Sequence, residues 1–262
     1  MSILGRTKFT LKSTAPPFLL EAARDLKHYN DRHPGHGAYT SLVEGKAGIE
    51  IGGPTVWLFR YIIPLYQSVA ALDGVNFSAN TIWEGDIGAN AGRYAYYKDK
   101  VGRQFISEAA DLSRVEDQSY DFLLSSHCLE HIANPIRAVK EWKRVVKRGG
   151  AMMLFLPNRA YTFDHWRAFT TFEHLLSDYD KGTPESDLTH LDEILEKHDY
   201  AMDAHSGGAE KFRARSLDNF TNRCLHHHVF NLDLLKMIFD FAGVETVRRE
   251  GIANSFAIVG RV

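Results

Sequence analysis

His127, Glu130 and His131 lie within five consecutive residues, and their side chains could move a proton or bind a metal ion. On one helical turn these side chains would share a face, because positions three and four apart are neighbours on a helix. Three roles are open: hydrogen bonds to nearby backbone, proton transfer by His127 or His131, and metal binding. Metal binding needs a further ligand such as His165, and the spacing is loose for a metal site. We therefore favour a site without a metal ion.

Another histidine, His165, directly follows Asp164 in the loop after a predicted strand at residues 149–158. Parallel sheets bind ligands at the carboxyl ends of their strands, so this loop should face a substrate. An imidazole held by a carboxylate is a suitable general base, and we predict that His165 is that base. Residues 226–228 are three histidines, but only alternate residues of a strand share a face. That run is therefore expected to edge a pocket or an interface rather than to chelate as a unit.

The paired glycines Gly52 and Gly53 follow an apolar run at residues 47–51 that also contains the carboxylate of Glu50. Residues without a side chain allow a ligand to approach the backbone closely. Pro54 removes one backbone donor and stiffens the turn. The combination indicates a ligand-binding turn, although a glycine pair alone also suits a tight structural turn.

Short apolar runs alternate with helical patterns along the first part of the chain, which predicts an α/β fold with a parallel sheet. A helix is clearest at residues 134–147, where Asn134 can cap the first turn and Pro135 fits the first helical position. Strands are predicted at residues 47–51, 68–75, 103–109, 120–126, 149–158, 244–249 and 255–261, with a closing helix at 232–242.

The sequence divides into four segments by composition and pattern. Residues 1–45 read as a helical lead-in or cap, and residues 46–158 as a ligand-binding core. Residues 159–230 lose the clean alternation and are rich in histidine, aspartate and aromatic residues, which indicates an insertion or lid on the substrate side. Residues 231–262 supply the closing helix and strands of the core.

Three stretches resemble the turns of the class I S-adenosylmethionine-dependent methyltransferases. They are Glu50-Ile51-Gly52-Gly53, Gly74-Val75-Asn76-Phe77-Ser78, and Leu129-Glu130-His131-Ile132, the last of which is similar to the type-11 branch. The resemblance covers about residues 45–160. It implies a Rossmann-like sheet of seven mostly parallel strands with an antiparallel last strand, helices on both faces and the His-rich insertion in addition. Pro54 departs from the family pattern, which often has another glycine there.

The same resemblance implies that residues 46–158 bind S-adenosylmethionine and release S-adenosylhomocysteine. Glu50, Gly52 and Gly53 would lie near the methionine part of the cofactor. Its ribose would be held by Asn76, with Asp73 as the second candidate. The remaining implied contacts are Asp111 and Leu112 at the adenine, and Ser126 and His127 on the methionine side.

The overall charge and composition disfavour several classes of partner. A formal net charge of −2 and a pI of about 6.7 give no basic footprint for nucleic acid. The sequence has no apolar run of the roughly 20 residues that a membrane-spanning helix needs. Two cysteines, Cys128 and Cys224, are too few for a disulfide framework and suit a reducing cytoplasm. Ordinary helix faces leave the oligomeric state open.

We therefore expect a cytoplasmic S-adenosylmethionine-dependent methyltransferase that methylates an oxygen of a small-molecule or glycosyl acceptor by in-line displacement. A hydroxyl acceptor needs a base, and His165, His127 and His131 are the candidates. One alternative is a binding or scaffold protein on the same fold, which Pro54 and Asn76 would suit. Another is an NAD-dependent oxidoreductase, which would need a Gly-x-Gly-x-x-Gly turn that residues 52–57 lack.

Overall fold

The apolar runs of the sequence become buried strands, as the fully covered Ile49 and Ile51 of the first strand show. The computed structural model describes residues 24–88 and 92–262. The strands of its main sheet are β1 (Ala47–Ile51), β2 (Ala71–Asn76), β5 (Arg93–Tyr97), β6 (Lys100–Ile106), β7 (Tyr120–Ser126), β8 (Val146–Pro157), β9 (Glu245–Ile252) and β10 (Ser255–Arg261). Their order across the sheet is β5-β6-β2-β1-β7-β8-β10-β9.

The central strands of this sheet are parallel, from β6 through β2, β1 and β7 to β8. The last strand, β10, lies between β8 and β9 and is antiparallel to both. The predicted mostly parallel sheet with an antiparallel last strand is therefore confirmed. The described residues form eight strands in this sheet rather than seven, because β5 adds an antiparallel edge next to β6.

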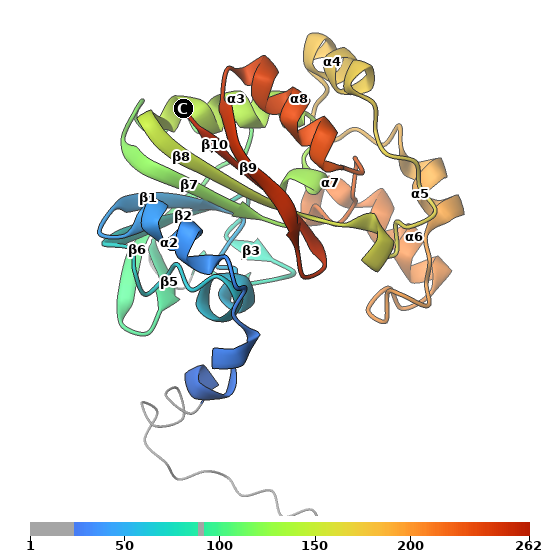
Figure 1. Cartoon of the computed structure of the whole chain (residues 1–262). Helices are drawn as coiled ribbons and strands as arrows, with labels where there is room; N and C mark the ends of the chain where they lie inside the picture. The colour runs from blue at the N-terminus through green and yellow to red at the C-terminus, as the bar shows by residue number, and fades with distance from the viewer. Residues whose placement is uncertain (1–23, 89–91) are drawn as a thin grey trace, which may run out of the picture.

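Helices cover both faces of the sheet, as predicted (Figure 1). On one face α3 (Pro135–Val145) and α8 (Leu232–Ala242) pack side by side against β7, β8 and β10. On the other face lie α2 (His36–Val43) and the π-helical segment η2 (Trp57–Ile62). Successive side chains of a strand point to opposite faces of the sheet, so the sheet separates two apolar cores.

Helix α3 begins as its sequence predicts. Asn134 Oδ1 accepts a hydrogen bond from the backbone N–H of Arg137 at 3.1 Å, and Pro135 occupies the first turn. The helix ends at Val145, two residues before the predicted end, because Val146 already pairs with Tyr120 as part of β8.

Residues 159–230, all of them described, contribute helices and loops and no strand to the sheet. The helices are η5 (Arg159–Tyr161), α4 (Phe172–Lys181), α5 (Leu191–Lys197), α6 (Ala209–Leu217) and α7 (Asn219–Asn222). The yellow and orange helices of Figure 1 gather to one side of the sheet. Four buried apolar side chains of residues 159–230 form a small core of their own: Leu191, Ile194, Phe212 and Leu225.

The predicted lead-in is described only from residue 24, so its first part lies outside the described residues. The described part holds η1 (Tyr29–Asp31) and α2. Two short strands, β3 (Asn80–Thr81) and β4 (Gly85–Asp86), form a separate hairpin. Within the described residues no helix is long and apolar enough to cross a membrane. The division into four segments remains a prediction.

Candidate active site

A cavity of about 860 Å³ lies at the carboxyl ends of the central parallel strands. Gly52 lines it just after β1, Asn76 at the end of β2, Ser107 just after β6, and Ser126 at the end of β7. These strands are adjacent in the sheet, so residues far apart in sequence meet around one hollow. This is the edge at which open parallel sheets bind ligands.

The glycine turn after β1 forms one wall of this cavity. Gly52 lines the cavity and has a φ of +78°, a left-handed conformation that favours glycine. Gly53 lies directly over Glu50: a Cβ atom on Gly53 would come within 2.3 Å of both the Glu50 carboxylate and the Tyr94 hydroxyl. The peptide bond between Gly53 and Pro54 is cis. Both glycines are therefore required by the local geometry of the turn.

Glu50 is fully buried beneath this turn and does not line the cavity. Its carboxylate accepts hydrogen bonds from Tyr94 Oη at 2.7 Å, from Tyr66 Oη at 2.8 Å and from the backbone N–H of Thr55 at 2.9 Å. Burial raises the pKa of Glu50, and the hydrogen bonds from Tyr94 and Tyr66 act against that rise. In this structure Glu50 lies behind the cavity wall, because three neighbours already occupy its carboxylate and Gly53 covers it, and its contact with the cofactor stays a prediction.

Of the two candidates for the ribose contact, Asn76 lines the cavity and Asp73 does not. Asn76 Nδ2 donates to the carbonyl oxygen of Gly53 at 3.0 Å, which joins the end of β2 to the glycine turn. Asp73 accepts hydrogen bonds from the backbone N–H of Arg103 at 2.7 Å and from Tyr120 Oη at 2.7 Å. The carboxylate of Asp73 therefore links three strands within the sheet and is not available to a ligand in the cavity.

The predicted adenine contacts, Asp111 and Leu112, lie away from this cavity. Asp111 lines a separate surface hollow beside α3, and its Oδ1 accepts from the backbone N–H of Ser113 at 3.1 Å. Leu112 is fully buried in the core. These two residues lie outside the cavity because β6 ends at Ile106, three residues before the predicted end at 109. The residues that follow β6 and line the cavity are Ser107, Glu108 and Ala109.

Ser126 and His127, at the end of β7, line the cavity where the sequence placed them. His127 has a φ of +49°, and its Nε2 is hydrogen-bonded to Ser255 Oγ at 2.8 Å. Burial lowers the pKa of His127 to about 4, so its ring is neutral at pH 7. A neutral, hydrogen-bonded imidazole of this kind shapes the cavity wall and is a weak base.

Glu130 and His131 lie on the short helix η4 (Leu129–His131) and meet His226 inside the cavity. One ligand atom of each of these three side chains lies within 4.8 Å of the other two. Burial raises the pKa of Glu130 to about 7, and neither of its oxygens has a hydrogen-bond partner among the described residues. His131 Nδ1 donates to the carbonyl oxygen of Leu225 at 3.1 Å. The partner of Glu130 and His131 is therefore His226, not His127 or His165.

His226 is hydrogen-bonded to Asp164, the carboxylate that the sequence analysis paired with His165. Its Nδ1 donates to Asp164 Oδ2 at 2.5 Å, and Arg167 Nη1 donates to Asp164 Oδ1 at 3.0 Å. Burial alone would raise the pKa of Asp164, but the charges of His226 and Arg167 hold it at about 2. His165 bonds instead to Asp199 at 2.8 Å and does not line the cavity. The structure therefore places His165 outside the cavity, and its role as the base stays a prediction.

The other side of the cavity comes mostly from the β3–β4 hairpin and from residues 159–230, which the sequence predicts on the substrate side. Trp83 of the β3–β4 hairpin and Phe163 after η5 provide aromatic walls, and the rings of Trp83 and His131 lie 5.3 Å apart. Charged side chains complete this side: Glu185, Asp203, Arg215 and Arg223. Arg223 Nη2 donates to Glu108 Oε1 at 2.5 Å, which links the insertion to the end of β6. No local sequence signal identifies these contacts, because they join distant segments.

Comparisons with known proteins agree with this geometry. Residues 50–154 match the sequence model of a family described as a methyltransferase domain. An S-adenosylmethionine-dependent methyltransferase from Mesorhizobium loti superposes with a TM-score of 0.52 at 12% identity, covering 87% of this chain and 96% of that chain. No curated protein matches the sequence.

Two further solved structures are similar over most of their length. A Haloferax volcanii chain solved in complex with the Trm112 methyltransferase activator has 16% identity, a TM-score of 0.48, and coverage of 93% of this chain and 95% of that chain. An S-adenosylmethionine-dependent methyltransferase from Methanosarcina mazei has 16% identity, a TM-score of 0.47, and coverage of 87% and 97%.

The family match over residues 50–154 and the mostly parallel sheet are consistent with the class I S-adenosylmethionine-dependent methyltransferases. The cofactor that this family implies is S-adenosylmethionine. The segment matched by the family model begins at Glu50, within β1, and ends at Leu154, within β8. It therefore spans the strands whose ends surround the cavity.

Proposed function

We propose that this protein transfers the methyl group of S-adenosylmethionine to a hydroxyl oxygen of a small-molecule or glycosyl acceptor bound in the 860 Å³ cavity. The observation that carries the proposal is the position of Glu130. This buried carboxylate lies in the wall of the cavity, burial raises its pKa to about 7, and neither of its oxygens has a hydrogen-bond partner in the described part of the chain.

The residues at the strand ends fit the cofactor. Gly52 leaves room for the backbone approach that the methionine part requires, Asn76 can bond ribose hydroxyls, and Glu108 can accept from the adenine amino group. When bound there, S-adenosylmethionine supplies an electrophilic methyl group on sulfur, whose bond to sulfur breaks as the acceptor oxygen attacks in line. The strand ends hold the reacting groups in that alignment, which contributes several kcal/mol to the rate.

Glu130 is the residue that we assign to proton removal from the acceptor hydroxyl. An acid whose pKa lies near the working pH is efficient in this role, and burial brings Glu130 to about 7. His226 lies beside it in a fixed orientation, because Asp164 holds its Nδ1. In this arrangement His226 is a positioning residue for the carboxylate and for the acceptor.

The cavity has the size and lining that a small polar acceptor needs. Its volume lies in the upper part of the range of about 300–1,000 Å³ found for small-molecule sites, so an acceptor can bind beside the cofactor. Aromatic Trp83 and Phe163 offer flat apolar surfaces, while Arg215 and Asp203 offer polar contacts. Aromatic platforms with polar neighbours suit a hydroxyl-rich or glycosyl ligand. Cys128 and Cys224 are both unpaired, which supports our placement of this reaction in the cytoplasm.

The test begins with release of S-adenosylhomocysteine, measured over a panel of hydroxylated metabolites and glycosides. For an acceptor found in this way, we expect kcat/KM to rise with pH through about 7 as Glu130 loses its proton, and then to level off. Glu130→Gln should reduce kcat by at least about 100-fold and abolish this pH limb. A glutamine keeps the shape of the side chain but cannot take the proton.

His165→Asn is the matched control, because His165 lies outside the cavity and should change kcat by less than about twofold. If kcat/KM does not change with pH near neutrality, or if Glu130→Gln leaves kcat unchanged, Glu130 is not the group that removes the proton. A divalent cation found between Glu130, His131 and His226 in crystals of the active enzyme would replace proton transfer with metal binding by these three residues.

A further inference from the structure

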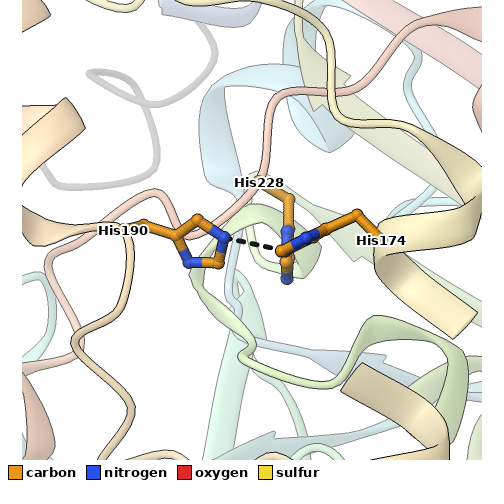
Figure 2. Close-up of side chains that lie close together, drawn as sticks. All are labelled: His174, His190 and His228. Carbon is orange, nitrogen blue, oxygen red and sulfur yellow. Dashed lines mark hydrogen bonds between the residues drawn. The ribbon is translucent and has the colours of Figure 1, made fainter. Parts of the chain in front are cut away.

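Three histidines from separate segments converge at a place outside the cavity (Figure 2). His174 lies on α4, His190 immediately precedes α5, and His228 lies in the extended segment before α8. His190 and His228 are largely or fully buried, while the side chain of His174 is 42% exposed. The family fold and the proposed reaction use none of these three side chains.

The ring nitrogens of the three histidines point toward a common position. His174 Nε2 and His190 Nε2 are 2.8 Å apart, and one ring nitrogen of each residue lies within 4.8 Å of the others. The rings meet edge to face, with interplanar angles of 73° between His174 and His190 and 75° between His190 and His228. The rings are therefore steeply inclined to one another and do not stack face to face.

Several buried polar atoms around this cluster have no hydrogen-bond partner among the described residues: His190 Nδ1, His228 Nδ1 and Asp178 Oδ2. Asp178 Oδ2 lies 3.1 Å from His174 Nε2 and 3.8 Å from His228 Nε2. Asp178 Oδ1 accepts a hydrogen bond from Thr183 Oγ1 at 3.0 Å, which fixes the carboxylate. Buried polar atoms usually have partners, so a group of orphaned atoms around three imidazoles indicates a missing cation.

We propose that His174, His190 and His228 bind a zinc ion, with Asp178 as the nearest further oxygen ligand. Imidazole nitrogen and carboxylate oxygen are the ligands of many zinc sites, and three histidines leave room for a fourth ligand. The carboxylate beside the rings also offsets part of the charge of the cation. The ion ties α4 and the start of α5 to the segment that precedes α8.

This zinc ion has a structural role for the insertion. His228 lies two positions after His226, and residues 185 and 223 of the same region line the cavity. Because the ion binds the folded arrangement and the unfolded chain has no preformed site, it stabilises the folded state. It thereby holds the acceptor side of the cavity in place, at a site separate from the one where we place the chemistry.

The test uses the full-length chain without an affinity tag, stripped of metal and titrated with Zn²⁺ in a calorimeter. We expect a site with a Kd in the micromolar range or below, and a higher Tm when zinc is bound. His174→Ala should weaken this site at least about tenfold, and it is the variant least disruptive to folding because His174 is half exposed. Co²⁺ in place of zinc should give the visible absorption of a cobalt ion bound by nitrogen.

Two controls separate this cluster from the rest of the protein. His28→Gln, in the turn before η1, and Glu130→Gln, in the cavity, should both retain this zinc site. Zinc binding that is absent from the wild type, or unchanged in His174→Ala, would overturn the proposal. Binding that survives His174→Ala but is lost in Asp187→Asn would also overturn it, because the ligands would then be Asp187, His190 and His227.

Discussion

At the scale of single residues, the carboxylate of Glu50 stabilises the glycine turn. Glu50 receives hydrogen bonds from two tyrosines and one backbone N–H, and it is fully covered by protein. A buried carboxylate of this kind fixes the turn that forms the cavity wall. The sequence identifies Glu50 as important but cannot show which way its side chain points, because Tyr66 and Tyr94 approach it only in the folded chain.

Replacement of Glu50 by alanine should therefore unfold the protein more easily. The change leaves Tyr66, Tyr94 and the N–H of Thr55 without a buried acceptor, so we expect a loss of about 3 kcal/mol or more in the free energy of unfolding. Urea denaturation measures this loss, and the exposed Glu44→Ala is the control. Unchanged stability with weaker cofactor binding would instead restore Glu50 to the cofactor site.

His127 should make the stability of the folded chain depend on pH. Its pKa is about 4 when folded and about 6.5 when unfolded, so between these values only the unfolded state takes up the proton. Its contribution to stability is complete above pH 6.5 and is lost as the pH falls toward 4, and this loss is small because the residue is exposed to solvent, which screens its charge.

His127→Gln removes this titration while keeping a polar side chain of similar size. The free energy of unfolding of the variant should therefore fall less than that of the wild type between pH 7.5 and pH 4.5, as measured by urea denaturation. A difference between the two proteins that stays the same at both pH values would show that His127 is not held neutral in the fold.

At the scale of elements, the ends of the strands decide which residues reach the cavity. Strand β6 ends at Ile106, so Glu108 faces the hollow and Asp111 faces the separate surface hollow beside α3. The chain pattern located this strand correctly and misjudged its end by three residues. That error is enough to choose the wrong carboxylate, because strand boundaries are the least certain part of a pattern.

Glu108 and Asp111 should accordingly respond differently to substitution. Glu108→Ala should raise the Kd of S-adenosylhomocysteine about tenfold, since it removes one charge-assisted hydrogen bond. Asp111→Ala should change that Kd by less than about twofold, because its carboxylate bonds to the backbone of Ser113. Isothermal titration calorimetry gives both values. The reverse order of effects would return the adenine contact to Asp111.

The predicted elements were recovered where their signals are local. The capping residue and the apolar face of helix α3 can both be recognised within one short stretch of sequence. The buried strands have continuous apolar runs. Strand β5 was missed because it is an edge strand whose exposed Arg93 and Ala95 alternate with buried Tyr94 and Tyr96. Its hydrogen bonds depend on the antiparallel pairing with β6, which no short pattern reveals.

At the scale of the whole molecule, the cavity joins two parts of the chain. The strand ends of the sheet supply Gly52, Asn76 and Glu108, and the insertion supplies His226 and Arg223. The first set follows from local turns, so its general location was predicted. For the second set, the sequence predicted that residues 226–228 edge a pocket or an interface, but not the pairing of His226 with Asp164, because these two residues are 62 positions apart and meet only through the fold. Asp164 and His165 are adjacent in sequence, but Asp164 is hydrogen-bonded to His226 and His165 to Asp199.

The central claim is that the cavity at the ends of β1, β2 and β6 binds the cofactor. Calorimetric titration of the wild type with S-adenosylhomocysteine tests it most directly, with Asn76→Ala and Asp73→Asn measured alongside. We predict a single site that Asn76→Ala weakens about tenfold and Asp73→Asn leaves within about twofold, since only Asn76 lines the cavity. Absence of binding to the wild type at millimolar ligand would contradict the account and favour a non-catalytic scaffold.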